Sequence, residues 1–272
     1  MSCCHKVTRS KPLMGDVISL STLGLHGVCA MRAIRVAFAQ LEKLAATIDT
    51  GNADSELMRL CAQSPGVPVA VSRPLWYMLR LAQEVAYRSD GVFDVAATGT
   101  GGAADWMDID LSVQGFVTLR RPLMIDLGGI CKGFAVDMAV QALRDAGVRR
   151  GIVDMGGHIR AFGAQEWRVH FHLDAKAGGV GLPVMLNDGA ISGFGGALGG
   201  GTFFDTTRHM ARSASEWGEM SMLVRAPTAA AADALTVVAA LMPGTAARVL
   251  SAFGAHGIVL TPSGAHALEY AS

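Results

Sequence analysis

The chain has 272 residues, of which 51% are hydrophobic and 17% are charged. Lysine plus arginine number 23, as do aspartate plus glutamate, so no net charge would attract the protein to nucleic acid or to an anionic membrane. This length can bury one large core, and we expect one domain over residues 13–272 after a basic N-terminal tail over residues 1–12.

The five cysteines are odd in number and show neither Cys-x-x-Cys nor zinc-finger spacing, so we do not expect a disulfide framework. The sequence contains no run of about 18 apolar residues, which is the length needed to span a bilayer. Its N-terminus lacks the apolar stretch of a secretory signal. The sequence as it stands predicts a cytoplasmic protein, or a periplasmic one if a signal or lipoprotein segment has been removed.

The first part of the chain shows one strand pattern and then several helical patterns. Residues 17–23 alternate as a strand does, and residues 28–48 repeat apolar side chains at a helical period. Residues 54–60 predict a capped helical turn. A further helix is predicted over residues 74–87, with Ser72 as its cap.

The run from Met124 to Asp137, Met-Ile-Asp-Leu-Gly-Gly-Ile-Cys-Lys-Gly-Phe-Ala-Val-Asp, is the most informative stretch. Residues 122–125 are short and apolar enough for a buried strand, and a helical period begins at Gly133. The glycines at 128–129 let the backbone approach a ligand where unpaired N–H groups gather, and Lys132 adds a positive charge. The pattern is typical of a site for a phosphate-bearing ligand. It is equally typical of a tight turn whose acid is only a cap.

The C-terminal half predicts strands over residues 167–173, 189–192, 220–225 and 257–261, and helices over residues 229–241 and 246–253. Thr228 is a natural cap for the first of these helices. Within that helix, Asp233 is an acid in an otherwise apolar run. It either lies on a solvated face or needs a partner or a cation, because an isolated buried charge is costly.

These motifs together resemble the ApbE family, the flavin transferases that use FAD and a divalent metal to attach FMN to a Ser or Thr of a target protein. The stretch Asp126–Asp137 is close to the family's Asp-Leu-Gly-Gly-Ile-Ala-Lys-Gly-Tyr-Ala-Val-Asp. Segments at 54–60 and 153–160 resemble two further family motifs, and the resemblance covers most of residues 14–262. It implies a single compact α+β domain, ApbE-like or T-fold-like, with a mixed and mostly antiparallel sheet flanked by helices.

The resemblance also implies which residues form the site. It implies that a metal ion is bound by the Gly129 carbonyl, Asp233 and Thr236. Oxygen ligands with coordination positions left open for water are typical of Mg²⁺. It places FAD against five residues: Met14, Asp126, Gly128, Lys132 and Phe204. Asp233 would have a catalytic role by placing the ion, and Asp205 or a metal-bound hydroxide would be the base.

The chain departs from the family pattern around the expected metal. The family's threonine lies four residues beyond the aspartate, where this chain has Val237, and Thr236 is one position short. Since a helix turns about 100° per residue, this shift weakens the match of Thr236 to the family's metal-binding threonine. His158 stands where the family has an aspartate, and we expect it to be a buried, hydrogen-bonded ring.

Two further departures concern the walls of the flavin site. The family's His-x-x-Asp-Pro-x-Thr-Gly loop corresponds to residues 202–209, where Thr202 replaces the histidine and only Asp205 is retained. The family's segment after residue 95, which helps to wall the flavin pocket, is much shorter here.

We therefore expect a Mg²⁺-dependent FAD:protein FMN transferase that forms a phosphoester with a Ser or Thr, or a member that also hydrolyses FAD to FMN and AMP. The alternative is a catalytically impaired FAD-binding or partner-binding module that retains the fold, which the missing histidine and the shortened segment favour. A Rossmann dehydrogenase is not favoured, because Gly-x-Gly-x-x-Gly is absent in the required context. The expected partners are FAD and an acceptor flavoprotein with a Ser/Thr motif, with no nucleic acid and no membrane span; the oligomeric state does not follow from the sequence.

Overall fold

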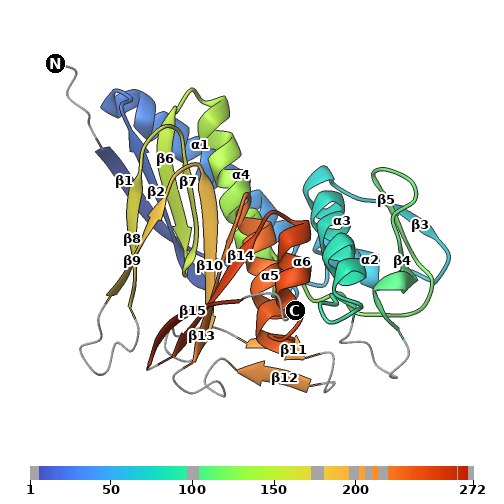
Figure 1. Ribbon diagram of the computed structural model, residues 1–272. Coiled ribbons are helices and arrows are strands. Elements are labelled where there is room, and N and C mark those ends of the chain that lie inside the picture. The colour runs from blue at the N-terminus through green and yellow to red at the C-terminus, as the bar shows by residue number, and fades with distance from the viewer. Residues whose placement is uncertain are drawn as a thin grey trace.

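An eight-stranded sheet forms the centre of the computed structural model, which describes residues 6–96, 104–172, 181–195, 202–205, 210–213, 220–261 and 263–268. In spatial order its strands are β1 (Lys6–Leu13), β2 (Asp16–Leu23), β6 (Arg150–Met155), β7 (His158–Phe162), β10 (Gly189–Gly195), β13 (Ser221–Ala226), β14 (His256–Thr261) and β15 (Gly264–Ala267). All neighbouring pairs in this order are antiparallel. Strand β1 therefore forms one edge of the sheet and β15 the other (Figure 1).

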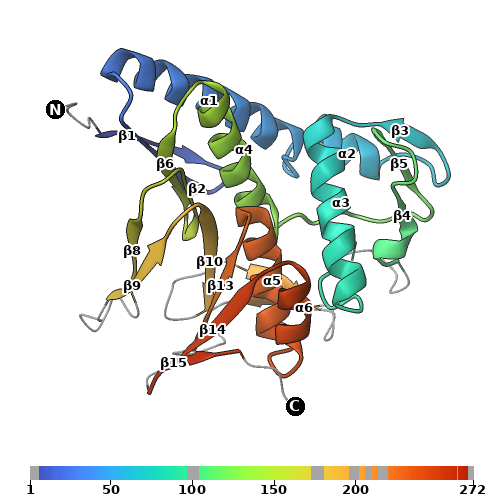
Figure 2. The same ribbon diagram turned by 45° about the horizontal axis from the view of Figure 1, so that its top comes forward.

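Four helices lie along one face of the sheet: α1 (Gly27–Thr47), α4 (Cys131–Asp145), α5 (Ala229–Leu241) and α6 (Ala246–Ala252) (Figure 2). The large hydrophobic core fills the space between these helices and the sheet. Helix α5 is the most deeply placed, since every residue of it except Leu241 is buried. Its many alanines allow this close approach to its neighbours.

The opposite face of the sheet is covered by a hairpin of β8 (Trp167–His172) and β9 (Gly181–Leu186). A second, smaller cluster lies beneath the hairpin, where Val169 and Leu186 meet Ile159, Ile191 and Leu223 of the sheet. The middle of the sheet is thus buried on both faces.

Beyond the helical face lies a second group of helices and short strands (Figure 1). It comprises α2 (Glu56–Cys61), α3 (Arg73–Arg88), the short helix η1 (Trp106–Asp108) and a three-stranded sheet of β3 (Pro68–Ala70), β5 (Phe116–Leu119) and β4 (Ile109–Asp110). A further pair, β11 (Thr202–Asp205) and β12 (Met210–Ser213), completes the described elements. The main core continues into α2, α3 and β5, so these parts form one compact unit.

The predicted α+β fold with a mostly antiparallel sheet flanked by helices is confirmed. Helices α1 and α3 end within one residue of their predicted limits, and α5 covers the predicted residues 229–241. Thr228 caps α5 as expected, because its side chain accepts a hydrogen bond from the Ala231 N–H at 3.3 Å. Among the described residues, no helix has the length and apolar character needed to cross a membrane.

Two expectations are wrong. Residues 6–12, assigned to a basic tail, belong to β1, which pairs with β2 along its whole length while Val7 and Leu13 contact the core. Residues 122–127 form a loop in place of the strand expected over 122–125. That loop is buried through Leu123 and Ile125, but the Asp126 N–H donates to the carbonyl of Val95 in another loop at 2.8 Å. The strand prediction was wrong because it rested on the apolar character of the segment, and apolar residues can also be buried in a loop.

Candidate active site

Helices α4 and α5 run antiparallel and cap each other's N-termini. The Gly133 N–H in the first turn of α4 donates to Asp233 Oδ2 at 2.9 Å. In return, the N–H groups of Ala229 and Ala230 at the start of α5 each donate to the Asp137 carboxylate at 2.9 Å. Each carboxylate satisfies N–H groups that lack an intrahelical partner and lies at the positive end of the other helix dipole. The two helices are therefore held in a fixed register.

This register depends on glycines where the helices touch. A Cβ at Gly133 would lie 2.2 Å from the Ala229 carbonyl oxygen, so a larger residue cannot occupy this position without moving backbone. A Cβ at Gly129 would lie 3.2 Å from a methyl carbon of Val237 and 3.1 Å from the Phe93 ring. The contact thus brings α5 against the diglycine loop that the sequence singled out.

Asp233 is a buried carboxylate, with only 5% of the residue exposed. Burial raises its pKa, although the nearby His158 ring and the Gly133 N–H oppose that rise. His158 Nδ1 lies 3.4 Å from Asp233 Oδ1 and 2.6 Å from the hydroxyl of Ser192. The expected hydrogen-bonded ring at His158 is found, and its contact with Asp233 is new. The carboxylate has weak compensation for its burial, which suits a site that receives a cation.

Val237 lies beside the diglycine loop, because its Cγ2 would be 3.2 Å from a Cβ at Gly129. The Thr236 hydroxyl donates to the carbonyl of Ala232 in its own helix at 2.5 Å. Within the described ranges, no three His, Cys, Asp or Glu side chains are grouped so that they could hold a metal ion. Asp233 lies one helical turn before Val237 and therefore on the same side of α5 as the valine that faces the diglycine loop.

A cavity of about 460 Å³ opens next to the loop. Its lining consists of Met14, Ala45, Ala46, Ile48, Asp49, Thr50, Leu57, Asp126, Leu127, Gly128 and Cys131. Three of the five residues predicted to contact the flavin, Met14, Asp126 and Gly128, therefore share one cavity, whose volume is typical of a ligand pocket. Asp126 Oδ1 also accepts the Gly128 N–H at 2.8 Å, which holds the loop in a tight turn.

Lys132, the fourth predicted contact, forms an ion pair with Asp16 at the start of β2, with Nζ and Oδ2 2.8 Å apart. Burial raises the pKa of the Asp16 carboxyl, but hydrogen bonds from Lys132 and the Val17 N–H outweigh this and hold the pKa below its usual value. A Cβ at Gly156 would lie 2.0 Å from Asp16 Oδ2, so the turn after β6 encloses the pair. Lys132 keeps two further N–H donors that a phosphate could use.

The remaining predicted residues, Phe204 and Asp205, lie on β11, where their backbones pair with Ala211 and Met210 of β12. Their side chains, and residues 206–209 after them, lie outside the described part of the structure.

Asp94 is a half-buried acid near the site that the sequence did not mark as functional. Its carboxylate accepts the N–H groups of Ala96 at 2.7 Å and Trp106 at 3.1 Å, so it ties together two points of the chain on either side of residues 97–103. Burial raises its pKa to about 6, against the opposing effect of these two hydrogen bonds. The neighbouring Phe93 contacts Gly129, which links this segment to the diglycine loop.

Replacing Asp94 with asparagine should therefore change how stability depends on pH. Since the folded state holds the Asp94 proton more tightly than the unfolded chain, its contribution to stability falls as pH rises from about 4 to about 6. Asp94→Asn lacks this titration, so the difference in unfolding free energy between variant and wild type should shift by about 2–3 kcal/mol across that range in favour of the variant at higher pH. Urea unfolding at several pH values measures it, and parallel pH curves for the two proteins would contradict the assignment.

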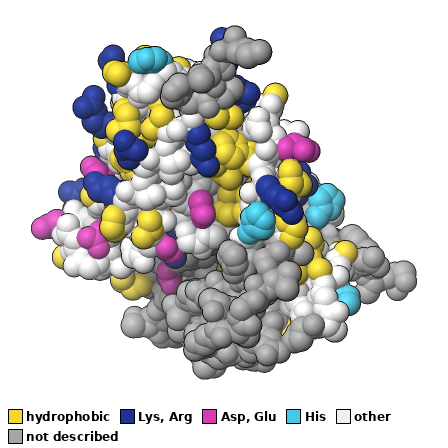
Figure 3. Space-filling view, turned by 90° about the vertical axis from the view of Figure 1, so that its left-hand side faces the viewer, with side chains coloured by type: hydrophobic (Ala, Val, Ile, Leu, Met, Phe, Trp, Pro, Cys, Tyr) yellow, Lys and Arg dark blue, Asp and Glu magenta, His cyan; other side chains and the backbone are white. Residues whose placement is uncertain are grey.

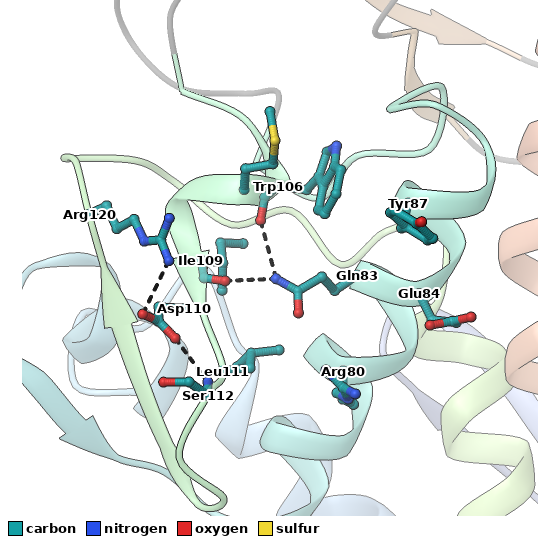
Figure 4. Close-up of a pocket in the computed structure, with 11 residues that line it drawn as sticks. Arg80, Gln83, Glu84, Tyr87, Trp106, Ile109, Asp110, Leu111, Ser112 and Arg120 are labelled. Carbon is teal, nitrogen blue, oxygen red and sulfur yellow. Dashed lines mark hydrogen bonds and ion pairs between the residues drawn. The ribbon is translucent and has the colours of Figure 1, made fainter.

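Another cavity, of about 470 Å³, lies between α3 and the β4–β5 strands (Figure 4). Its polar groups largely satisfy one another: Gln83 Nε2 donates to the Ile109 carbonyl at 2.8 Å, and Arg120 pairs with Asp110 at 3.3 Å. None of the predicted site residues lines it. We therefore place the candidate site at the diglycine loop.

Sequence reasoning missed the partners that set the site's geometry. Asp16, Asp137 and His158 each contact a residue from a distant part of the chain. Asp137 carried a usable signal, because it follows Gly133 by four residues and so extends the same face of α4.

The chain is similar to one family of known proteins over most of its length. The family model described as "ApbE family" matches residues 14–105 and 100–254. A protein of Treponema pallidum named FAD:protein FMN transferase is 28% identical over 162 residues, which are 48% of this chain and 44% of that protein. One of the same name from Klebsiella pneumoniae is 24% identical over 184 residues, 59% of this chain and 56% of that protein. The chain thus matches about half the length of these curated relatives.

Solved structures show the same fold over nearly the whole chain. The flavin transferase ApbE from Vibrio cholerae superposes with a TM-score of 0.76 at 21% identity and covers 99% of this chain and 98% of its own. The flavinyl transferase ApbE of Pseudomonas stutzeri in its apo form gives a TM-score of 0.78 at 15% identity, with 97% and 94% covered.

Proposed function

Because the chain belongs to the ApbE family, we propose that it is an FAD:protein FMN transferase, which attaches FMN through a phosphoester to a Ser or Thr of an acceptor flavoprotein. The observation that carries the proposal is the position of Asp233, buried against the start of α4 where the diglycine loop and the cavity of Met14, Asp126 and Gly128 meet. The same site would account for hydrolysis of FAD to FMN and AMP when water replaces the acceptor.

The proposed reaction breaks the pyrophosphate of FAD at the flavin-side phosphorus. The acceptor oxygen forms the new bond to that phosphorus, the bond to the AMP oxygen breaks, and the hydroxyl proton passes to a base, for which we propose Asp205. The loop of Gly128 and Gly129 brings the backbone close to the phosphates, and Lys132 supplies positive charge beside it. These groups stabilise the charge on the phosphate oxygens as the leaving group departs.

We further propose that the reaction requires Mg²⁺, held by the Asp233 carboxylate and the Gly129 carbonyl. The buried carboxylate lacks a full ionic partner, and a divalent cation would supply one. When bound, the ion would neutralise phosphate charge as a Lewis acid. Since Val237 offers a methyl group where the family has a hydroxyl, FAD phosphates and water must provide the other ligands.

Replacing Val237 with threonine should strengthen Mg²⁺ binding. The γ-carbon of Val237 already lies beside Gly129, so a hydroxyl on that γ position would add an oxygen ligand without a change in shape. We expect the Mg²⁺ concentration for half-maximal AMP release to fall by about tenfold. The matched control is Val237→Ala, which shortens the side chain without adding an oxygen and should show no such gain. If both variants behave alike, the ion is not held at this position.

Incubation with FAD, Mg²⁺ and a peptide carrying the family's Ser/Thr acceptor motif tests the proposed function. Mass spectrometry detects the FMN adduct, and chromatography detects AMP. Adduct and AMP in equal amounts support the transferase, whereas AMP without adduct indicates a pyrophosphatase. A protein that binds no FAD at all would end the flavin proposal.

A second candidate is a module that binds FAD or a partner protein but has lost turnover. It is favoured by Thr202 in place of the family's histidine and by the methyl group of Val237 beside Gly129. FAD binding without adduct or AMP would support this alternative.

A further inference from the structure

Strand β1 is an exposed edge that leads to the candidate cavity. Its only neighbour in the sheet order is β2, and no other described strand pairs with its outer side. The pairing with β2 is regular from Lys6 to Leu13, so the outer side presents a continuous row of backbone groups about 26 Å long. The next residue, Met14, lines the candidate cavity. A chain added along β1 would therefore end at the proposed site of chemistry.

The surface along this edge is basic. Strand β1 carries Lys6, Arg9 and Lys11, all exposed. Lys11 pairs with Glu42 of α1, and Arg35 precedes Glu42 by two helical turns on the same side of that helix. Figure 3 shows Lys and Arg side chains gathered in the upper part of the face on which β1 lies. Glu42 is the only acid on α1 to offset this charge.

An apolar hollow lies at the other end of the edge. A cavity of about 720 Å³ is lined by the first turns of α1, from His26 to Arg35, and it includes Val28, which is 74% exposed. Because Lys6 pairs with Leu23 just before α1 begins, this hollow lies near the start of β1. The edge thus connects an apolar hollow, a basic strip and the candidate cavity.

We propose that the outer edge of β1 binds an extended, acidic segment of the acceptor protein as an added strand and delivers its Ser or Thr hydroxyl to the cavity at Met14. This inference rests on the proposed transferase function. Backbone hydrogen bonds along β1 would supply affinity, as in other cases of strand addition. Arg9 and Arg35 would select acidic side chains, and an apolar residue would fill the hollow at Val28.

The chemistry of the edge favours this occupant over two others. A second copy of the chain would pair one basic β1 with another, which places like charges opposite each other. An anionic membrane would match the charge, but a lipid surface cannot use the row of backbone donors and acceptors.

Hydrogen exchange with two synthetic peptides tests the binding directly. Both peptides carry one Thr, flanked by Asp and Glu in the first and by Lys in the second. The acidic peptide should slow exchange over residues 6–13, and the basic peptide should not. A dimer in sedimentation whose dissociation on dilution speeds exchange over residues 6–13, with no peptide present, would overturn the proposal in favour of a second copy. Binding to phosphatidylglycerol vesicles without protection by the acidic peptide would overturn it in favour of a membrane surface.

The variant Arg9→Glu/Arg35→Glu reverses two charges, and neither residue lines the candidate cavity at Met14. It should raise the acceptor concentration needed for half-maximal transfer by about tenfold, while FAD binding, AMP release without acceptor and thermal unfolding stay unchanged. Arg248→Glu, a single charge reversal at an exposed position of α6 far along the chain from β1, should leave acceptor use unchanged. Unaltered acceptor use in the double variant would refute the docking edge. If the wild type transfers nothing, the proposed function fails, whereas the exchange measurement still decides whether β1 binds the acidic segment.

Discussion

Replacing Gly133 with alanine is expected to lower the thermal stability of the protein by a large amount. The added Cβ would lie 2.2 Å from the oxygen and 2.6 Å from the carbon of the Ala229 carbonyl, both of them backbone atoms of α5. Relief requires the helices to separate, which breaks the bonds from Gly133 to Asp233 and from Ala229 and Ala230 to Asp137.

The stabilising and destabilising effects of this substitution on the free energy of unfolding are unequal. Alanine favours a helix interior over glycine by about 1 kcal/mol. Overpacking costs about 1–3 kcal/mol and each lost cap about 1 kcal/mol more, so we expect a net loss of about 3 kcal/mol or more. That is a large part of the roughly 5–15 kcal/mol by which a domain is stable.

Thermal unfolding followed by circular dichroism measures the effect. The matched control is Gly27→Ala at the first residue of α1, where a Cβ would meet no atom within 4 Å, and its midpoint should equal or exceed that of the wild type. If Gly133→Ala unfolds at the wild-type temperature, α4 and α5 do not cross as described.

The elements predicted best are those whose limits depend on local chemistry. Helix α5 begins after the Thr228 cap and continues through an unbroken apolar run, so neighbouring residues alone define it. Strand β1 was missed because its sequence, Lys-Val-Thr-Arg-Ser-Lys-Pro-Leu, is mostly polar and becomes a strand only by pairing with β2. The loop over residues 122–127 shows the converse, since apolar residues can be buried without joining a sheet.

The sequence predicted those features of the candidate site that depend on residues close together in one segment. The spacing within α5 showed that Thr236 is one position short of the family's threonine and that Val237 stands there, and Val237 lies beside the diglycine loop. The ion pair of Lys132 with Asp16 joins residues 116 positions apart, and the contact of Asp233 with His158 joins two separate elements. Such pairings depend on the tertiary fold, so a single sequence does not contain them in readable form.

Replacing Asp233 with asparagine is expected to abolish activity and to leave the fold intact or more stable. The asparagine oxygen can still accept the Gly133 N–H, and its amide can donate to His158. Burial raises the pKa of Asp233, so the folded state holds this proton more tightly than the unfolded chain and stability falls as pH rises from the usual aspartate range to the raised value. The neutral variant escapes this loss, and its unfolding midpoint at neutral pH should equal or exceed that of the wild type.

Activity should respond in the opposite direction, because asparagine lacks the negative charge that we propose to hold Mg²⁺. We expect AMP release and FMN transfer to fall by about a hundredfold or more. Asp188→Asn makes the same chemical change at an exposed residue that pairs with Arg144, and it should retain activity. An Asp233→Asn protein that is stable and inactive shows that the chain keeps a buried charge at a cost in stability because the reaction needs it. If that variant is stable and fully active, the carboxylate serves only to cap α4, and the catalytic centre must lie elsewhere.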